Sequence, residues 1–154
     1  MTLIEELLRE NSKFNSEDLH DHLGLGCIFL SDDKRKILLL DHVKFNFFTI
    51  PIGKVKYNET VVQGLKVEMS EELGVKLIKF HKVDVNTNNF DRNGKTIKVT
   101  QHVFLVDKYS GTPTNLEPEK HRSLEWYSLN KALSMNISDT TRRMIEGIQA
   151  NIIE

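Results

Sequence analysis

The segment from residue 53 to residue 75 constrains this chain most, because its second half has the apolar spacing of an α-helix. Apolar residues recur there every three or four positions, and at about 100° per residue they form one stripe. The stripe consists of Val62, Leu65, Met69 and Leu73. We therefore expect a helix with one face packed against a core.

Three carboxylates, Glu68, Glu71 and Glu72, fall on a different face of the same helix. Like charges three or four residues apart destabilise an isolated helix by about 0.2–0.5 kcal/mol per pair. A divalent cation would offset this repulsion, since carboxylate oxygens are the ligands that Mg²⁺ and Mn²⁺ prefer. The alternative is a solvated charged face with no ligand.

A longer pattern surrounds this helix. Gly53 is followed after five residues by Glu59, and after seven more by Val-Glu-Met-Ser-Glu-Glu-Leu-Gly-Val at 67–75. This resembles the signature of the Nudix hydrolases, which is Gly, five residues, Glu, seven residues and Arg-Glu-apolar-any-Glu-Glu-any-Gly-apolar. Val67 is the one departure, standing where the family has Arg.

The resemblance continues upstream and covers most of the chain from about His22 onward. Residues 48–55 are similar to the family's aromatic-x-x-Pro-Gly-Gly-x-apolar segment, with Ile52 in place of the first Gly. It implies an α/β (α+β) fold, a Nudix-like α/β/α sandwich with a central mixed sheet. We expect a helical extension at 1–22, followed by a single Nudix domain at 23–154.

The resemblance also implies a metal site. The Gly53 carbonyl and the side chains of Glu68 and Glu72 would hold Mg²⁺ or Mn²⁺, with Glu71 as a further ligand or water-holder. Glu59 would support these ligands without binding the metal itself, by hydrogen-bonding the loop or the helix carboxylates. Gly74 would end the helix in the left-handed conformation.

The implied catalytic residues are Glu68, Glu71 and an acidic residue of the loop before Trp126. Glu119 is our first choice for that loop residue and Glu117 is the second. Aromatic side chains near a phosphate site can stack on a base. Phe48 and Phe90 are accordingly predicted to bind substrate, although core packing is an equally good reading for each.

The implied activity is metal-dependent hydrolysis of a pyrophosphate bond in a nucleoside diphosphate joined to another group. Nucleotide sugars, ADP-ribose, dinucleoside polyphosphates and nucleoside triphosphates all qualify. Val67 cannot supply the charge of an Arg, so we expect weakened or retuned catalysis unless Lys56 or Lys66 compensates. The alternatives are a nucleotide-binding or regulatory module with little turnover and an interaction domain that uses the N-terminal helix.

Composition and charge limit the kinds of molecule that this protein is expected to bind. Lys and Arg total 21 against 22 Asp and Glu, a formal net charge of −1, so no basic field favours nucleic acid as a partner. Cys27 is the only cysteine, which excludes a disulfide within the chain. No apolar run approaches the 18 or so residues of a membrane span. We expect a cytoplasmic protein that acts on a small nucleotide and has no membrane partner. If the protein self-associates, we expect a homodimer.

Outside the helix, much of the chain between residues 23 and 106 has the apolar patterns of β-strands. Apolar runs at 23–31 and 36–43 around a polar turn predict a hairpin buried on both faces. Residues 75–85 have strand character, and 86–94 predict a polar loop ending in an Asn-Gly turn. Alternation along 97–106 predicts a returning strand.

The last third predicts a loop and short elements. Residues 107–123 are rich in turn formers, 124–129 are strand-like, and 131–135 predict a brief helix. Ser138 has the position of a cap for a final amphipathic helix that extends to about Ile153.

Overall fold

The computed structural model describes residues 21–56, 58–92 and 94–154. In chain order the strands are β1 (Asp21–Ile28), β2 (Lys36–His42), β3 (Phe47–Thr49), β4 (Ile52–Lys54), β5 (Lys76–Arg92), β6 (Lys95–Ser110) and β7 (His121–Ser128). The helices are α2 (Val61–Leu73), α3 (Leu129–Leu133) and α4 (Asp139–Gln149). The predicted extension at 1–22 falls almost wholly outside the described residues.

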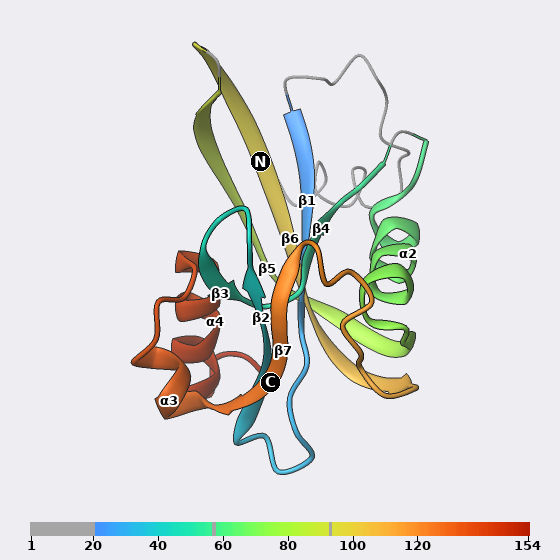
Figure 1. Ribbon diagram of the computed structural model, residues 1–154, viewed down its shortest axis with the longest axis vertical. Helices are drawn as coiled ribbons and strands as arrows, with labels where there is room; N and C mark the ends of the chain where they lie inside the picture. The colour runs from blue at the N-terminus through green and yellow to red at the C-terminus, as the bar shows by residue number, and fades with distance from the viewer. Residues whose placement is uncertain (1–20, 57, 93) are drawn as a thin grey trace.

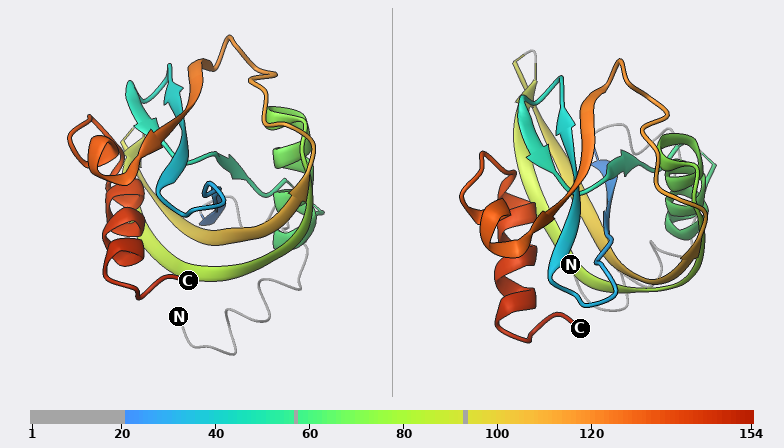
Figure 2. Two further views of the ribbon diagram at one scale, coloured as in Figure 1. Left: turned by 90° about the horizontal axis from the view of Figure 1, so that it is seen from below. Right: turned by 60° about the horizontal axis from the view of Figure 1, so that its bottom comes forward.

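The strands form two sheets with helices on either side (Figure 1). One sheet has the order β4-β1-β6-β5 and is mixed, because β1 runs parallel to β6 and antiparallel to β4. The other is antiparallel, with the order β3-β2-β7. Helix α2 covers one side of the strands and α3 and α4 cover the other, as both views of Figure 2 also show. This arrangement confirms the predicted α/β/α sandwich with a mixed sheet.

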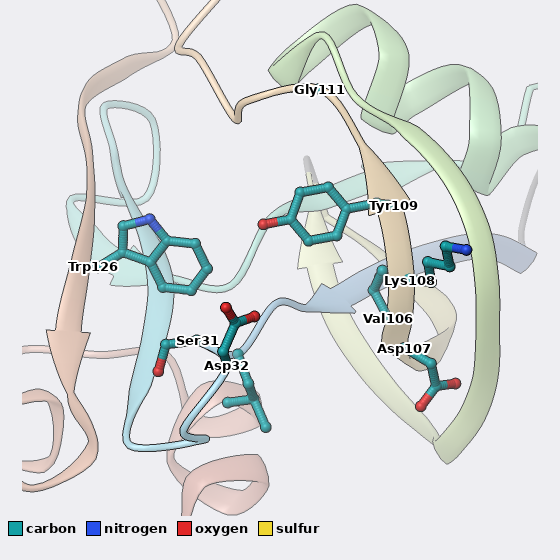
Figure 3. Close-up of a pocket in the computed structure, with 9 residues that line it drawn as sticks. Ser31, Asp32, Val106, Asp107, Lys108, Tyr109, Gly111 and Trp126 are labelled. Atoms are coloured by element: carbon teal, nitrogen blue, oxygen red, sulfur yellow. The ribbon is translucent and has the colours of Figure 1, made fainter.

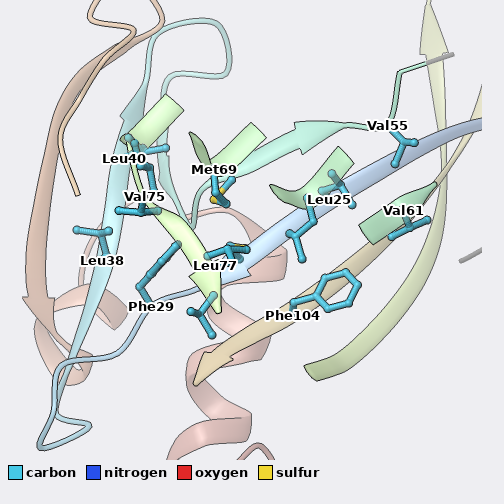
Figure 4. Packing of buried hydrophobic residues seen from close by; sticks show 14 of the residues in the cluster. Leu25, Phe29, Leu38, Leu40, Val55, Val61, Met69, Val75, Leu77 and Phe104 are labelled. Atoms are coloured by element: carbon cyan, nitrogen blue, oxygen red, sulfur yellow. The ribbon is translucent and has the colours of Figure 1, made fainter. Parts of the chain in front are cut away.

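Side-chain alternation along the central strands builds the two cores. Leu38 and Leu40 of β2 face the α2 side, whereas Ile37 and Leu39 face the α3–α4 side. The same division holds in β1 and β6. Figure 4 shows the core beneath α2, which includes Met69 of the helix and Leu25 of β1. Burial of both strand faces explains why these strands read as continuous apolar runs.

Local signals determine the ends of α2. Thr60 caps its start by accepting from the backbone N–H of Gln63, and the Gln63 side chain accepts from the backbone of Thr60 in return. Gly74 ends the helix with φ 68°, as predicted. The apolar stripe begins at buried Val61, whereas Val62 is only half-buried, so the prediction of Val62 was wrong by one residue.

The predicted hairpin of the first two strands was only half right. Their junction does pair, since the Leu38 N–H donates to the Phe29 carbonyl at 3.1 Å. Beyond it β1 joins the mixed sheet and β2 joins the antiparallel sheet. The two runs therefore diverge instead of forming one ladder, because each finds its partner far away in sequence.

The predicted polar loop at 86–94 is in fact strand. β5 continues to Arg92 and pairs in register with β6 down to Arg92 opposite Lys95. Gly94 forms a turn between the two strands with φ 76°, whereas its predicted partner Asn93 lies outside the described residues. Polar residues are tolerated because this end of the long β5–β6 hairpin projects away from the core (Figure 1).

The C-terminal prediction was correct in its elements and wrong at its final boundary. β7, α3 and α4 all form, and Ser138 caps α4 by accepting from the backbone N–H of Thr141. Helix α4 ends at Gln149, where the predicted helix continued to about Ile153. None of the described helices is long and apolar enough to cross a membrane.

Candidate active site

The acidic residues converge at the inner face of α2, where β4 and the loop between β6 and β7 meet the helix. β4 contributes Gly53, α2 contributes Glu68 and Glu72, and the loop contributes Glu117. β4 and α2 are neighbours in the chain, but Glu117 is distant from both in sequence, so only the fold brings it to them.

Glu72 is the most unusual residue of this group. Its side chain is buried with 5% exposure, and its Oε2 atom has no hydrogen-bond partner. Burial, followed by the charges of Glu68 and Glu117, raises its pKa to about 8. A buried carboxyl without a partner is costly, so this atom is suited to an added cation.

Glu68 lies one helical turn before Glu72 and is half-buried. It packs directly on Gly53, where an added Cβ would come within 2.8 Å of the Glu68 Cγ. Burial raises the pKa of Glu68, Lys56 lowers it, and Glu71 and Glu117 raise it further. Glycine at position 53 thus lets the Glu68 carboxylate approach the β4 backbone.

The loop between β6 and β7 is fastened to the end of α2. The backbone N–H of Leu116 donates to the Glu72 carbonyl at 3.0 Å, and that of Thr114 donates to the Leu73 carbonyl at 2.9 Å. These bonds satisfy carbonyls that the last turn of a helix leaves open. They also hold Glu117 where its charge raises the pKa of both Glu68 and Glu72.

The loop glutamates differ in what they face. Glu117 is half-buried and its Oε2 lies 2.8 Å from the Nζ of Lys120. Glu119 is exposed, and its charge acts on His121 rather than on the helix carboxylates. The structure therefore brings our second choice, Glu117, to the cluster, while the role of Glu119 stays a prediction.

Lys120 was missed by the sequence reasoning. Its pKa is raised by the hydrogen bond to Glu117 and by the charges of Glu117, Glu72 and Glu68. The lysine therefore lies close to the whole carboxylate cluster. Its proximity to the acidic loop was the available signal, but solvated loop lysines look identical in sequence.

Lys56 pairs with the carboxylate of Glu71, the residue that an Arg at position 67 would face. A residue at position 67 is four before Glu71, so an Arg there would face that carboxylate. Val67 cannot pair with it, but Lys56 Nζ lies 3.4 Å from Glu71 Oε2. Lys66 points elsewhere, with its Nζ over the Phe80 ring at 5.9 Å from the centroid. The geometry favours Lys56 of the two compensating lysines.

Glu59 supports the loop that carries Lys56. Its Oε1 accepts the backbone N–H of Lys56 at 2.9 Å, and the same atom lies against Gly64 of α2. The carboxylate thus ties the segment before the helix to the helix itself. Support of a metal site by Glu59 stays a prediction, and the contacts of its Oε1 are with the loop and the helix backbone.

The predicted substrate aromatics have mixed surroundings. Phe48 is half-buried, packs against the α3–α4 core and lies edge-on to Tyr127 at 5.8 Å. Phe45 is 47% exposed and stacks on His42 at 4.6 Å, which makes it the more accessible ring. Phe90 lies in strand β5 instead of a loop tip, and its side chain is outside the described part of the structure.

The residues present fit a divalent cation. No three His, Cys, Asp or Glu side chains within 21–56, 58–92 and 94–154 are close enough to form a metal centre by themselves. Mg²⁺ does not require that, because it is usually held by one or two carboxylates with water and substrate phosphates. The unpartnered Oε2 of Glu72 and the carboxylate of Glu68, which lies against Gly53, provide such a partial ligand set.

Comparison with known proteins identifies the family of this chain. The model of the NUDIX domain family matches residues 20–148, and the chain belongs to that family. The MutT NUDIX hydrolase of Burkholderia pseudomallei has a similar structure, with a TM-score of 0.71 and 28% identity, over 82% of this chain and 96% of its own. An Ap4A hydrolase from C. elegans, 18% identical with a TM-score of 0.61, shares the fold over 86% of this chain and 96% of its own.

Two curated relatives are also similar. The 8-oxo-dGTP diphosphatase of Buchnera aphidicola from Schizaphis graminum is 28% identical over 81% of this chain and 85% of its own length. The mouse oxidized purine nucleoside triphosphate hydrolase is 35% identical over 51% of this chain. That match spans about half of the mouse protein, 47% of its length.

The raised pKa of Glu72 predicts a stability change on Glu72→Gln. A folded-state pKa of about 8, against an ordinary value of 4.5, penalises the folded state as pH rises from 4.5 to 8. The neutral amide removes that penalty. We expect Glu72→Gln to stabilise the metal-free protein by about 1–3 kcal/mol at pH 9 and to change little at pH 4.5. Urea unfolding in EDTA at both pH values measures this.

Glu71→Gln is the matched control, because that carboxylate is exposed on the same helix and should leave stability almost unchanged at both pH values. A Glu72→Gln protein that is less stable than wild type at pH 9 would contradict the argument. It would mean that the buried carboxylate has a favourable partner.

Proposed function

We propose that this protein hydrolyses a pyrophosphate bond of a nucleotide with the help of Mg²⁺ or Mn²⁺. The observation that carries the proposal is the buried Glu72 carboxyl, unpartnered at Oε2 and facing the charges of Glu68 and Glu117. In this assignment Glu68, Glu72 and the Gly53 carbonyl hold the metal, with Glu71 or Glu117 completing the set. When bound, such an ion neutralises phosphate charge and lowers the pKa of the attacking water.

The chain's own residues would then position and move the proton. A water oxygen attacks one phosphorus, the bridging P–O bond breaks, and a carboxylate accepts the proton that water loses. Glu68 suits this role because burial raises its pKa towards the working pH. Lys120 and Lys56 place positive charge beside the cluster, where it balances the carboxylates and can contact phosphate oxygens.

The relatives guide the choice of substrate. The Buchnera protein is named for 8-oxo-dGTP and the mouse protein for oxidized purine nucleoside triphosphates. We propose a purine nucleoside triphosphate as the substrate class. ADP-ribose, nucleotide sugars and dinucleoside polyphosphates are the alternatives within the same chemistry.

A nucleotide-binding module with little turnover is the second candidate. Val67 favours it, because the exposed Lys56–Glu71 pair is a weaker orienting contact than an Arg on the helix. The two candidates share the fold and the binding site and differ only in product formation.

Substitution of Glu68 tests the enzyme directly. With Mg²⁺, wild type should convert at least one of 8-oxo-dGTP, dGTP, ADP-ribose, a nucleotide sugar and a dinucleoside tetraphosphate into two phosphate-bearing products. Glu68→Gln should lower kcat about 10²–10⁴-fold, because the proton acceptor is lost. Glu146→Gln, an exposed change on α4, is the control and should keep full activity. Nucleotide binding without product at high enzyme concentration would instead support the binding module.

The two loop glutamates can be separated by matched substitutions. Glu117→Gln should raise the Mg²⁺ concentration for half-maximal activity about tenfold, because one charge facing the helix carboxylates is lost. Glu119→Gln should change it less than twofold. Steady-state rates across a Mg²⁺ titration give both values. The opposite order would restore Glu119 as the loop residue that acts in the site.

Lys56 should act where the family has its Arg. Lys56→Met is expected to lower kcat about two- to fivefold, the range of an exposed ion pair. Adding Val67→Arg should restore the rate by pairing with Glu71 from the helix. Lys66→Met is the control with the same chemical change outside the site. Equal losses in Lys56→Met and Lys66→Met would contradict the assignment.

A further inference from the structure

A second hollow lies apart from the carboxylate cluster, between the end of β6, strand β7 and the turn that links β1 to β2 (Figure 3). Its volume is about 560 Å³, within the usual range of small-ligand sites. Its walls include Leu30, Asp32, Val106, Tyr109, Gly111 and Trp126. None of the carboxylates assigned to metal binding lines it, so it is a separate site.

Two aromatic rings form opposite walls of this hollow. Figure 3 shows Trp126 of β7 and Tyr109 of β6 facing the same space. Trp126 is 37% exposed, which is unusual for so large an apolar ring. Tyr109 is held in place by an edge-on contact with Phe29, with ring centroids 5.2 Å apart. The hollow is therefore lined by two aromatic rings, and the hydroxyl of Tyr109 points into the space between them (Figure 3).

Asp32 supplies a negative charge between the rings. Its carboxylate points into the hollow in Figure 3, where burial and then the charge of Asp32 raise the pKa of the Tyr109 hydroxyl, and no hydrogen bond or ion pair joins it to another residue that the structure describes. The neighbouring acids are engaged: Asp33 accepts from Ser31 at 2.7 Å, and Asp107 pairs with His81 at 2.7 Å.

The one lysine of the lining does not neutralise that charge. Lys108 alternates with Tyr109 along β6, and its side chain points away from the hollow (Figure 3). The inward-facing groups thus comprise two aromatic rings, the Tyr109 hydroxyl and the Asp32 carboxylate. This set is complementary to an organic cation, because a cation is attracted both by ring faces and by a carboxylate.

We propose that this hollow binds an organic cation of the guanidinium type, which enters between Trp126 and Tyr109 and pairs with Asp32. An arginine side chain or a small guanidine has the charge, flatness and size that the three groups accept. The proposal is independent of the pyrophosphohydrolase assignment, since it uses no residue of that site.

Trp126 reports on the site by itself, because it is the only tryptophan of the chain. Its fluorescence is followed while the full-length protein is titrated with N-acetylarginine amide or with N-acetylcitrulline amide, which has the same shape without the charge. Both titrations are made in 150 mM NaCl, where long-range charge attraction is screened. We expect a saturable change with the arginine amide and about tenfold weaker binding of the citrulline amide.

Substitutions separate the proposed pair from general effects. Asp32→Asn should weaken the arginine amide about tenfold, whereas Glu146→Gln on α4 and Glu68→Gln in the carboxylate site should leave its affinity unchanged. Trp126→Leu, followed by calorimetry, should abolish binding while circular dichroism shows a folded protein. Equal affinity for the two amides, or an Asp32→Asn protein that binds as well as wild type, would overturn the proposal. So would saturation by guanosine without any response to the arginine amide.

Discussion

The burial of the Glu72 carboxyl is the constraint around which the rest of the site is arranged. A carboxylate with 5% exposure and an unpartnered oxygen would be replaced by an apolar residue if packing alone mattered. The carboxyl lies where the charges of Glu68 and Glu117 raise its pKa further. A bound cation would offset this cost, which is the basis of the proposed metal site.

The framework around Glu72 is built to hold that unfavourable arrangement. α2 is closed at both ends by strong local caps, and its last carbonyls are taken by the backbone of the β6–β7 loop. The hydrogen bonds that Leu116 and Thr114 donate to these carbonyls also hold the loop so that Glu117 lies beside the cluster. Gly53 lets the β4 backbone and Glu68 approach each other without a clash. Stability and chemistry thus depend on the same contacts at one end of one helix.

The two apolar cores explain how the fold tolerates the free-energy cost of burying the Glu72 carboxyl. Central strands bury both faces, with alternate side chains directed to α2 or to α3 and α4. The α2 side bears the acidic cluster, whereas the α3–α4 side buries the neutral polar residues Thr49 and Thr141, and the Thr141 hydroxyl accepts from the Ile50 N–H. The carboxylates are therefore concentrated on one layer. The hollow at Trp126 opens where the end of β6 and β7 belong to different sheets.

The sequence by itself determined α2, its caps and the spacing of its carboxylates, because these depend on residues within a turn or two of each other. It also indicated the alternating strands, the Asn-Gly turn and the cap of α4. Tertiary structure alone decided that β1 and β2 join different sheets, that residues 86–92 are strand and that Glu72 is the buried acid. It likewise brought Glu117 and Lys120 to the cluster and placed Lys56, instead of Lys66, beside Glu71. These outcomes depend on which distant segments dock together, and the free energy of that docking is not encoded in any local window of the chain.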